Sequence, residues 1–381
     1  MPDKLFAEVA TMQSQDAFLP VGNRFTEAQI AEAVDLIRNA GRLPAHRHEF
    51  LLREAITTSD FPYLFGTVIE HEMLARYRFA AAPWRPYTKV STLLNFNIHQ
   101  RHMLDGLTGR LPVVGEKGEY LVDPKPIHSR RYIQLTKKGK QFDISWESLI
   151  NDGLGAFSDV AQRYADAASN TEYFDVTSLY SSAAGPNVLL YGAPIVAPDG
   201  TNVTNLGALP LTIANLETTI ELMASQTDAL GNPLGIRALH LVVPPGLEFT
   251  ARQILTSSVK AWVNDAVAAA VPMPTNNVVA QIGLQLHINP WLPIVDATGN
   301  DQGTWYLFAD TTHGYAIEFA YLRGHESPEI CMKASDKVTP AGALISPFSG
   351  DFATDNVFYR VRTVTGGTQL DPRMTYAQVS T

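Results

Sequence analysis

Hydrophobic residues recur at helical spacing through the first eighty positions of the chain. A capping box at Thr26–Gln29 opens one apolar stripe and predicts a first helix. A second, short helix is expected over residues 45–55. Ser59 or Asp60 then begins a third helix, whose apolar stripe reaches about Tyr77. The chain is therefore predicted to start with a helical segment.

The pattern changes to strand-like alternation over residues 83–142, which are rich in proline and glycine. Alternating segments flank two glycines between 111 and 122, and two further segments follow at 131–135 and 141–144. We predict one or two extended hairpins that project from the body of the protein. Because a lone two-stranded ribbon is marginally stable in water, such a hairpin needs a surface that covers it.

A long helix is predicted next, over residues 156–182, with apolar side chains along one side. At 1.5 Å per residue its main run would be about 40 Å long. The same helix is loaded with acidic side chains, namely Asp159, Asp166, Glu172 and Asp175.

Residues 187–312 alternate between helical and strand patterns, which indicates an α/β module. Thr212 precedes a helical stripe, a second helix is expected over 247–255, and two apolar strands are expected at Ala238–Val243 and Trp305–Ala309. The tail from Gly314 is rich in β-formers. Its predicted strands cover residues 315–322 and 357–364.

The charges are divided unevenly along the chain. Residues 76–147 carry thirteen Lys or Arg and six acids, so this stretch is net +7, whereas the whole chain has a formal charge of −9. The other 309 residues therefore sum to −16. A basic projection on an acidic body is attracted to a second copy of that body, and this favours a self-assembling subunit over a lone enzyme.

Composition narrows the class further. A length of 381 residues leaves room for two or three domains, and 45% hydrophobic with 18% charged residues indicates a folded protein. Cys331 is the only cysteine, so no intrachain disulfide is possible. We expect no signal peptide and no contact with a membrane, since the apolar runs are too short to span a bilayer.

Motifs that carry chemistry are missing from the sequence. It contains no GxGxxG, GxxxxGK[ST], GxSxG or HExxH pattern. His99 and His102 share a helical spacing, but we do not expect these two histidines to bind a metal. Cys331 is read as a small buried hydrophobe. We therefore expect no catalytic residue, no cofactor and no metal site.

The basic run from Arg130 to Lys140 has three interpretations. It can bind nucleic acid, it can be a solvated hairpin, or it can be an arm that reaches another subunit. The arm is favoured because the long helix already carries the acids that would neutralise it, whereas DNA would meet the negative remainder of the chain.

Two segments resemble a known family. They are Thr57-Thr-Ser-Asp-Phe-Pro-Tyr-Leu-Phe, with the helix that follows it, and the run Lys138-Gly-Lys-Gln-Phe-Asp-Ile-Ser-Trp-Glu-Ser-Leu-Ile-Asn-Asp-Gly-Leu-Gly-Ala-Phe. The chain resembles tailed-bacteriophage major capsid proteins of the Hong Kong 97 type, especially the Mu-like head-subunit branch. These markers cover about residues 56–171, and the remainder matches by layout.

The resemblance implies an α+β fold with an N-terminal arm, an extended β-hairpin loop, a peripheral domain with a long spine helix, and an α/β axial domain. Mapped by resemblance, the segments are the arm at 1–57, the first peripheral part at 58–95, the extended loop at 96–144, the spine helix at 145–187, the axial domain at 188–312, the peripheral strands at 313–366, and a C-terminal return to the axial domain at 367–381.

The function that the resemblance implies is that of a major capsid protein, which self-assembles into hexamers and pentamers. Together these form the icosahedral shell of the virion, assembled in the host cytoplasm around double-stranded DNA that is bound without sequence specificity. Portal, scaffolding and decoration proteins are the expected partners. We also expect an intact N-terminal arm, with scaffolding supplied by another protein or not needed.

Contacts between subunits are predicted where the basic loop meets acids of a neighbour. The predicted set comprises Lys117, Arg130, Arg131, Lys137, Lys138, Lys140, Asp159, Asp166, Glu172 and Asp175. Other classes remain open at this point. An encapsulin-like nanocompartment shell shares the fold, a soluble α/β enzyme would use residues 188–312, and a DNA-binding protein would use the basic arm.

Overall fold

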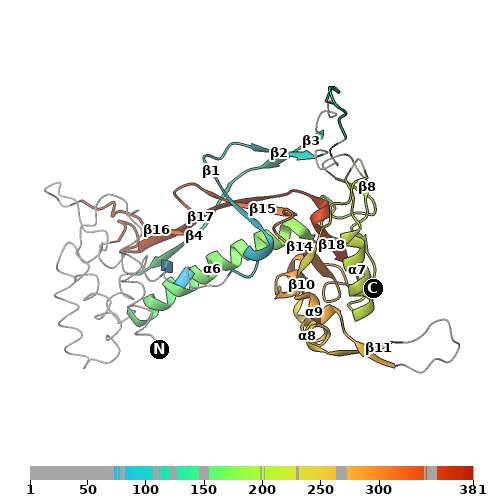
Figure 1. Cartoon of the computed structure of the whole chain (residues 1–381). Helices are drawn as coiled ribbons and strands as arrows, with labels where there is room; N and C mark the ends of the chain where they lie inside the picture. Colours follow the sequence, from blue (N-terminus) through green and yellow to red (C-terminus); the bar gives the residue numbers. More distant parts are fainter. Residues whose placement is uncertain are drawn as a thin grey trace, which may run out of the picture. The chain divides into compact units, whose positions relative to one another are not determined.

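The computed structural model describes the following residues (Figure 1): 73–74, 76–77, 82–105, 111, 113–120, 127–145, 154–197, 200, 202–228, 231–262, 273–338, 340 and 350–380. The helices predicted over 26–41 and 45–55, and most of the third, lie outside these residues. Of that third helix, residues 73–74 and 76–77 are helical, with Met73 buried.

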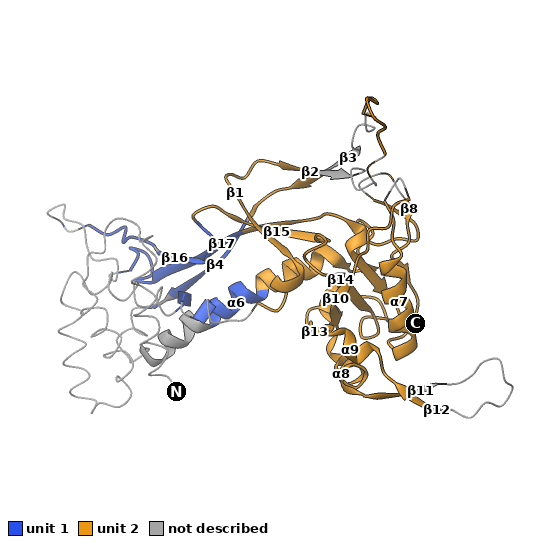
Figure 2. Cartoon of the chain, in the orientation of Figure 1, with its two compact units in different colours: residues 1–81, 137–170, 325–364 blue, residues 82–136, 171–324, 365–381 orange. Residues whose placement is uncertain are grey.

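The chain divides into two compact units (Figure 2). Unit 1 contains residues 1–81, 137–170 and 325–364. Unit 2 contains residues 82–136, 171–324 and 365–381. These units cut the chain differently from the seven predicted segments, whose boundaries stay a prediction.

Unit 1 holds strand β16 (Glu329–Met332), most of β4 (Thr136–Ile144), and the first parts of β17 (Val357–Gln369) and helix α6 (Leu154–Tyr180). β16 runs antiparallel to β17, and β4 also pairs with β17. The alternation of β17 buries Val357, Tyr359 and Val361 and exposes Arg360.

Aromatic stacking holds helix α6 against this part of the sheet. The ring of Phe142 on β4 stacks on Tyr164 of the helix at 4.8 Å and on Tyr359 of β17 at 5.1 Å. The opposite face of β17, which carries Arg360, points away from that helix.

Unit 2 contains a first sheet in which β1 (Lys89–Leu93) runs parallel to β15 (Ile317–Leu322), and β15 runs antiparallel to residues 365–369 of β17. A glycine of β17 permits a close approach between two backbone segments of this unit. A Cβ added to Gly366 would lie 2.2 Å from the carbonyl oxygen of Gln134, so a side chain at this position would force the backbone apart.

A two-stranded hairpin joins β2 (His99–Asp105) to β3 (Ile127–Ile133) in antiparallel register, from His99 opposite Ile133 to Asp105 opposite Ile127. The sequence predicts a hairpin in this part of the chain, but it places strands at 111–114, where the described residues form none. The strand expected at 141–144 begins earlier and belongs to β4, which pairs in the sheet.

The second sheet of unit 2 has the strand order β13-β10-β14-β18-β9. These strands cover Gln285–Ile288, Ala238–Val243, Trp305–Ala309, Thr375–Gln378 and Leu206–Gly207, respectively. β10 is parallel to β13 and antiparallel to β14, and the C-terminal strand β18 lies between β14 and β9.

Helix α7 (Ile213–Ala224) begins where the sequence predicts, because Thr212 caps it by accepting a hydrogen bond from the Asn215 amide at 3.2 Å. Helix α8 (Glu248–Thr256) follows β10. The remaining elements are η2 (Arg85–Tyr87), β5 (Ser181–Ser182), β6 (Gly185–Pro186), β7 (Ile195–Val196), β8 (Asn202–Val203), η3 (Pro245–Leu247), β11 (Val259–Trp262), β12 (Met273–Asn276), α9 (Val279–Ile282), α10 (Leu292–Val295) and η5 (Pro372–Met374).

The core of unit 2 is aromatic and lies on this second sheet. All five residues of β14 are buried. Tyr87 stacks on Phe308 at 4.8 Å, and Tyr180 packs edge-on against Tyr306 at 5.1 Å. The buried Asn289 amide donates to the Tyr180 hydroxyl, whereas the buried hydroxyls of Tyr87 and Tyr306 make no hydrogen bond within the described part of the chain. None of the described helices is long and apolar enough to cross a membrane.

Candidate assembly surface

The hairpin β2–β3 presents two different faces. On one face Ile133 is buried, and Arg101 and Arg131 stand directly opposite one another. On the other face Gln100 stands opposite Tyr132, and both side chains are exposed. Because side chains alternate along a strand, the outward face is exposed and the inward face contacts unit 2, although Arg131 on the inward face stays partly accessible.

Arg101 fixes the hairpin through a buried carboxylate. Glu318 on β15 has a side chain that is 0% exposed, and Arg101 reaches it with Nη2 at 2.6 Å from Oε1 and Nε at 3.0 Å from Oε2. The Ser91 hydroxyl on β1 donates to the same carboxylate, and the Lys89 ammonium lies 3.8 Å from it. A buried carboxylate is stable only when paired in this way.

Arg131 has no such partner. Its Nε is buried and makes no hydrogen bond, and within the described part of the chain its guanidinium makes no ion pair. The neighbouring Arg130 lies on β3, but its side chain is outside the described residues. Lys117 is exposed at a turn beyond the hairpin, with a positive φ of 61°, and the Gly118 amide closes that turn onto the Gly115 carbonyl.

The three predicted lysines lie on β4 and do not share one face. Lys137 and Lys140 are exposed and Lys138 is half-buried. Strand alternation places Lys138 and Lys140 on the side of Phe142 and Lys137 on the opposite side. A single partner surface therefore meets either Lys137 or the other two.

The predicted acids of helix α6 have different surroundings. The side chain of Asp159 is outside the described residues. Asp166 accepts from the Arg76 guanidinium at 3.3 Å on an exposed surface. Asp175 accepts from the Thr365 hydroxyl at 3.2 Å, and Glu172 is buried and accepts from the Tyr321 hydroxyl at 3.1 Å. Since Glu172 is enclosed by its own unit, we leave it out of the contacts proposed below.

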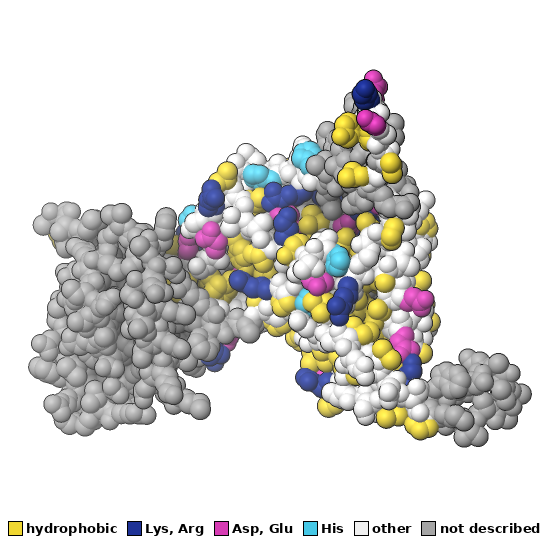
Figure 3. Space-filling model, viewed as in Figure 1, with side chains coloured by type: hydrophobic (Ala, Val, Ile, Leu, Met, Phe, Trp, Pro, Cys, Tyr) yellow, Lys and Arg dark blue, Asp and Glu magenta, His cyan; other side chains and the backbone are white. Residues whose placement is uncertain are grey.

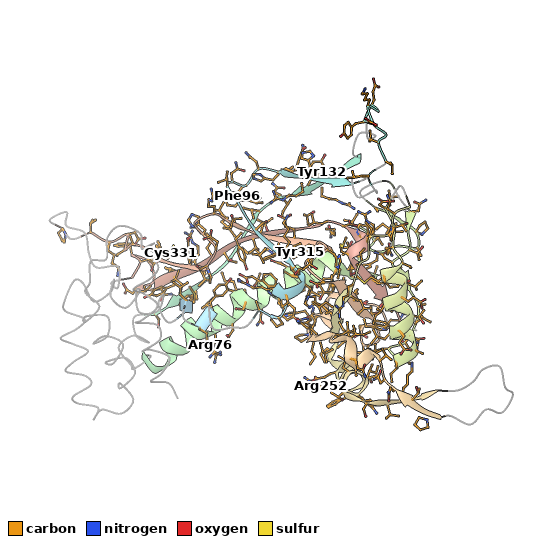
Figure 4. All side chains as sticks on the ribbon, in the orientation of Figure 1. Arg76, Phe96, Tyr132, Arg252, Tyr315 and Cys331 are labelled. Carbon is orange, nitrogen blue, oxygen red and sulfur yellow. The ribbon has the colours of Figure 1, made fainter. Side chains whose placement is uncertain are left out.

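Large hydrophobic side chains are exposed along the hairpin and along residues 94–98, which lead into it, although the sequence pattern points only to charges there. Phe96 is 46% exposed and Tyr132 is 57% exposed (Figure 4). Leu94 and Ile98 are exposed beside them, as are Leu111 and Val113 in the connecting segment. Contiguous exposed apolar side chains mark surfaces that another molecule covers.

The segment around Lys117 is acidic on balance. Glu116 and Glu119 are exposed on either side of Lys117 in the sequence, and Figure 3 shows acidic and basic side chains close together on the described surface. Neither glutamate has a partner among the described residues. The projecting loop therefore offers free carboxylates as well as cations.

No constellation typical of an enzyme is found in the described part of the chain. The described residues contain no group of three or more His, Cys, Asp or Glu that could hold a metal ion. His240 and His287 share a hydrogen bond of 3.1 Å between strands β10 and β13, and burial, with the neighbouring His240, lowers the pKa of His287 to about 4. Cys331 is half-buried on β16, so the expectation of full burial was wrong.

Comparison with protein-family models identifies one family. A family model described as phage capsid protein matches residues 130–378, well over half of the chain. Among solved structures, the capsid of the cyanophage P-SCSP1u is 12% identical, with a TM-score of 0.51 over 79% of this chain and 88% of that one.

Two further structures are less similar. The capsid of a native GTA particle is 14% identical, with a TM-score of 0.49 over 78% of this chain and 90% of that one. The structure of Gordonia phage Cozz is 14% identical, with a TM-score of 0.46 over 79% and 86% of the two chains. At these identities the cyanophage match shows the fold alone. No curated protein matches the sequence.

Proposed function

The chain belongs to the phage capsid protein family, and on that premise we propose how its copies are joined in the shell. It is a tailed-phage major capsid protein with the Hong Kong 97-type fold, and it is structural rather than enzymatic. Its place is in the virion capsid. The Mu-like branch stays a prediction.

We propose that copies of the chain form hexamers and pentamers, assembled in the host cytoplasm, that close around double-stranded DNA. Portal and scaffolding proteins, with decoration proteins on some shells, complete the proposed set of partners. The match to the phage capsid family favours this reading over a nanocompartment shell. A formal charge of −9 supports a wall that holds DNA loosely, because it offers few net phosphate contacts.

The observation that carries the proposal is the outward face of the β2–β3 hairpin. Tyr132 on this face, with Phe96 and Ile98 on the approach to the hairpin, exposes apolar surface that is unfavourable in water, and a two-stranded ribbon has little stability of its own. Burial of this apolar surface against a second copy would supply most of the affinity between subunits. The surrounding charges would then select the register, with each exposed pair contributing a few tenths to about 1 kcal/mol.

Charge reversal tests the electrostatic part of the proposal. Changing Lys137, Lys138 and Lys140 together to Glu should block or misdirect assembly, measured by electron microscopy and sedimentation of the purified protein. Because these residues divide between two faces of β4, the Lys137→Glu variant and the Lys138→Glu/Lys140→Glu variant should differ. The one that fails to assemble identifies the face that meets the neighbour.

The matched control changes the same three lysines to Arg, which retains the charge. This variant should form normal particles. Normal particles from the triple Glu variant would refute the role of these lysines in joining subunits. A further check measures DNA retention by the soluble subunit, which should be weak at physiological salt if the basic loop serves another subunit.

A further inference from the structure

Arg101 and Arg131 form a matched pair of cations with unequal surroundings. They stand opposite each other across the β2–β3 ladder, on the face that turns toward the body of unit 2. Like charges directly opposite in an antiparallel pair are destabilising unless an anion lies between them or beside them. The two arginines therefore need carboxylates, and among the described residues only Arg101 has one.

Glu318 is fully used by the first arginine. Arg101 contacts both of its oxygens, the Ser91 hydroxyl donates to Oε1, and the Lys89 ammonium lies near Oε2. The carboxylate is 0% exposed, so no approach from solvent remains. Two cations and a hydroxyl thus already share one negative charge, which leaves nothing for a third cation.

Arg131 is left as an incomplete half of an ion pair. Its Nε is buried without an acceptor, while the residue as a whole stays partly accessible. A buried donor that lacks a partner costs the desolvation of that group. The two predicted acids of α6 that belong to unit 2 have other partners, since Glu172 accepts from Tyr321 and Asp175 from Thr365.

We propose that Arg131 is a socket for a carboxylate side chain from a second copy of this chain. The proposal rests on the function proposed above and names the residue and the partner chemistry at that contact. A guanidinium fork suits a carboxylate better than any other common protein group. A second copy can supply one, because the chain is net negative and Glu116 and Glu119 stand exposed and unpaired among the described residues.

The two arginines separate this socket from a structural role. Replacing Arg131 by Gln should leave the melting temperature of the soluble subunit unchanged or slightly higher, since no internal bond is lost. The same variant should lower the assembled fraction at least tenfold. Replacing Arg101 by Gln should lower the melting temperature of the subunit itself, because it strands Glu318. Arg131→Lys keeps the charge without the fork and should assemble better than Arg131→Gln.

A photo-crosslinking residue placed at position 131 identifies the occupant. In particles it should link to a peptide of another copy that contains Asp or Glu, and in the unassembled subunit the same probe should give no link between chains. Particles that carry only links within one chain would overturn the socket and leave the shell function standing. A wild-type protein that never forms particles would instead contradict the proposed function.

A free anion is the rival occupant. The melting temperature of the wild-type subunit is compared in sodium sulfate and in sodium chloride of equal ionic strength. A higher value in sulfate that is absent in Arg131→Gln, together with no link between chains in the particles, would mean that the socket holds a small anion. That combination would overturn the proposal.

Discussion

The second sheet of unit 2 and the β2–β3 hairpin contrast in how they are stabilised. In the sheet, strand β14 is buried along its whole length and its neighbours contribute an aromatic core. In the hairpin, Tyr132 and Gln100 are exposed, and Phe96 and Ile98 remain exposed on its approach. Both regions are β-structure of one unit, but one buries its apolar residues and the other presents them.

The difference indicates where one chain is sufficient and where a second copy is needed. The sheet meets its main requirement internally, since the hydrophobic side chains of its central strands are covered. One arginine of the hairpin, Arg101, pairs with Glu318 on β15. The other, Arg131, has no ion-pair partner among the described residues. Changes in the sheet should therefore affect the isolated subunit, whereas changes at Arg131 or on the outward face of the hairpin should affect the assembly.

The largest effect on the subunit is expected in the sheet. Trp305 is 0% exposed and its indole Nε1 donates to the Leu209 carbonyl at 3.0 Å. Trp305→Ala would leave a cavity and an unmatched carbonyl, at a cost of about 4 kcal/mol. Thermal unfolding of the soluble subunit measures this. A melting temperature within a degree or two of wild type would show that the sheet does not carry the stability of the unit.

A smaller loss is expected at the base of the hairpin. Arg101→Gln leaves the fully buried Glu318 carboxylate without its main partner, which costs about 3 kcal/mol. The double variant Arg101→Leu/Glu318→Leu removes both charges and should recover most of that loss. If the double variant is as unstable as the single one, the pair is not what holds the hairpin.

Acidification should weaken the sheet through its histidine pair. His287 has a folded pKa of about 4, against 6.5 for the ordinary side chain, because burial and His240 disfavour its charged form. As pH falls, the unfolded chain therefore binds a proton at His287 before the folded chain does. The stability that the neutral His287 gives the folded state is fully present above pH 6.5 and is lost as pH drops toward 4. Because the His287 side chain is partly exposed and screened by solvent, the loss between pH 7 and pH 5 should be about 1 kcal/mol. His287→Gln should flatten this part of the profile, and an unchanged slope would contradict the assignment.

The smallest effect on the subunit is expected on the outward face of the hairpin. Tyr132→Ser removes an exposed ring and should change the unfolding free energy by less than about 0.5 kcal/mol. The same change should nevertheless reduce the yield of particles, counted by electron microscopy. A variant with normal particle yield would show that this face is not covered by a neighbour.

Local signals in the sequence predicted two of the five strands of the second sheet. The predicted strands at Ala238–Val243 and Trp305–Ala309 match β10 and β14, and Thr212 caps α7 as its side chain and spacing indicate. The long helix was predicted over 156–182 and runs over Leu154–Tyr180. These elements were predictable because continuous apolar runs and caps are read within a few residues of one another.

The hairpin was located less well, since its stability is not local. Strand β2 is rich in His, Arg and Gln and lacks clear alternation, so its strand state depends on pairing with β3. Arg101 and Glu318 are 217 residues apart, a separation that no local pattern reports. One signal was available: Glu318 interrupts the apolar strand Ile317–Leu322, and a charge in such a run calls for a buried partner.

Amide hydrogen exchange on the soluble subunit and on assembled particles tests the central claim most directly. Residues 99–105 and 127–133 should exchange much more slowly in particles than in the subunit, while β10 and β14 should be equally protected in both. Equal exchange of the hairpin in the two states would contradict the account, because it would mean that no second copy covers the surface on which the assembly is proposed to depend.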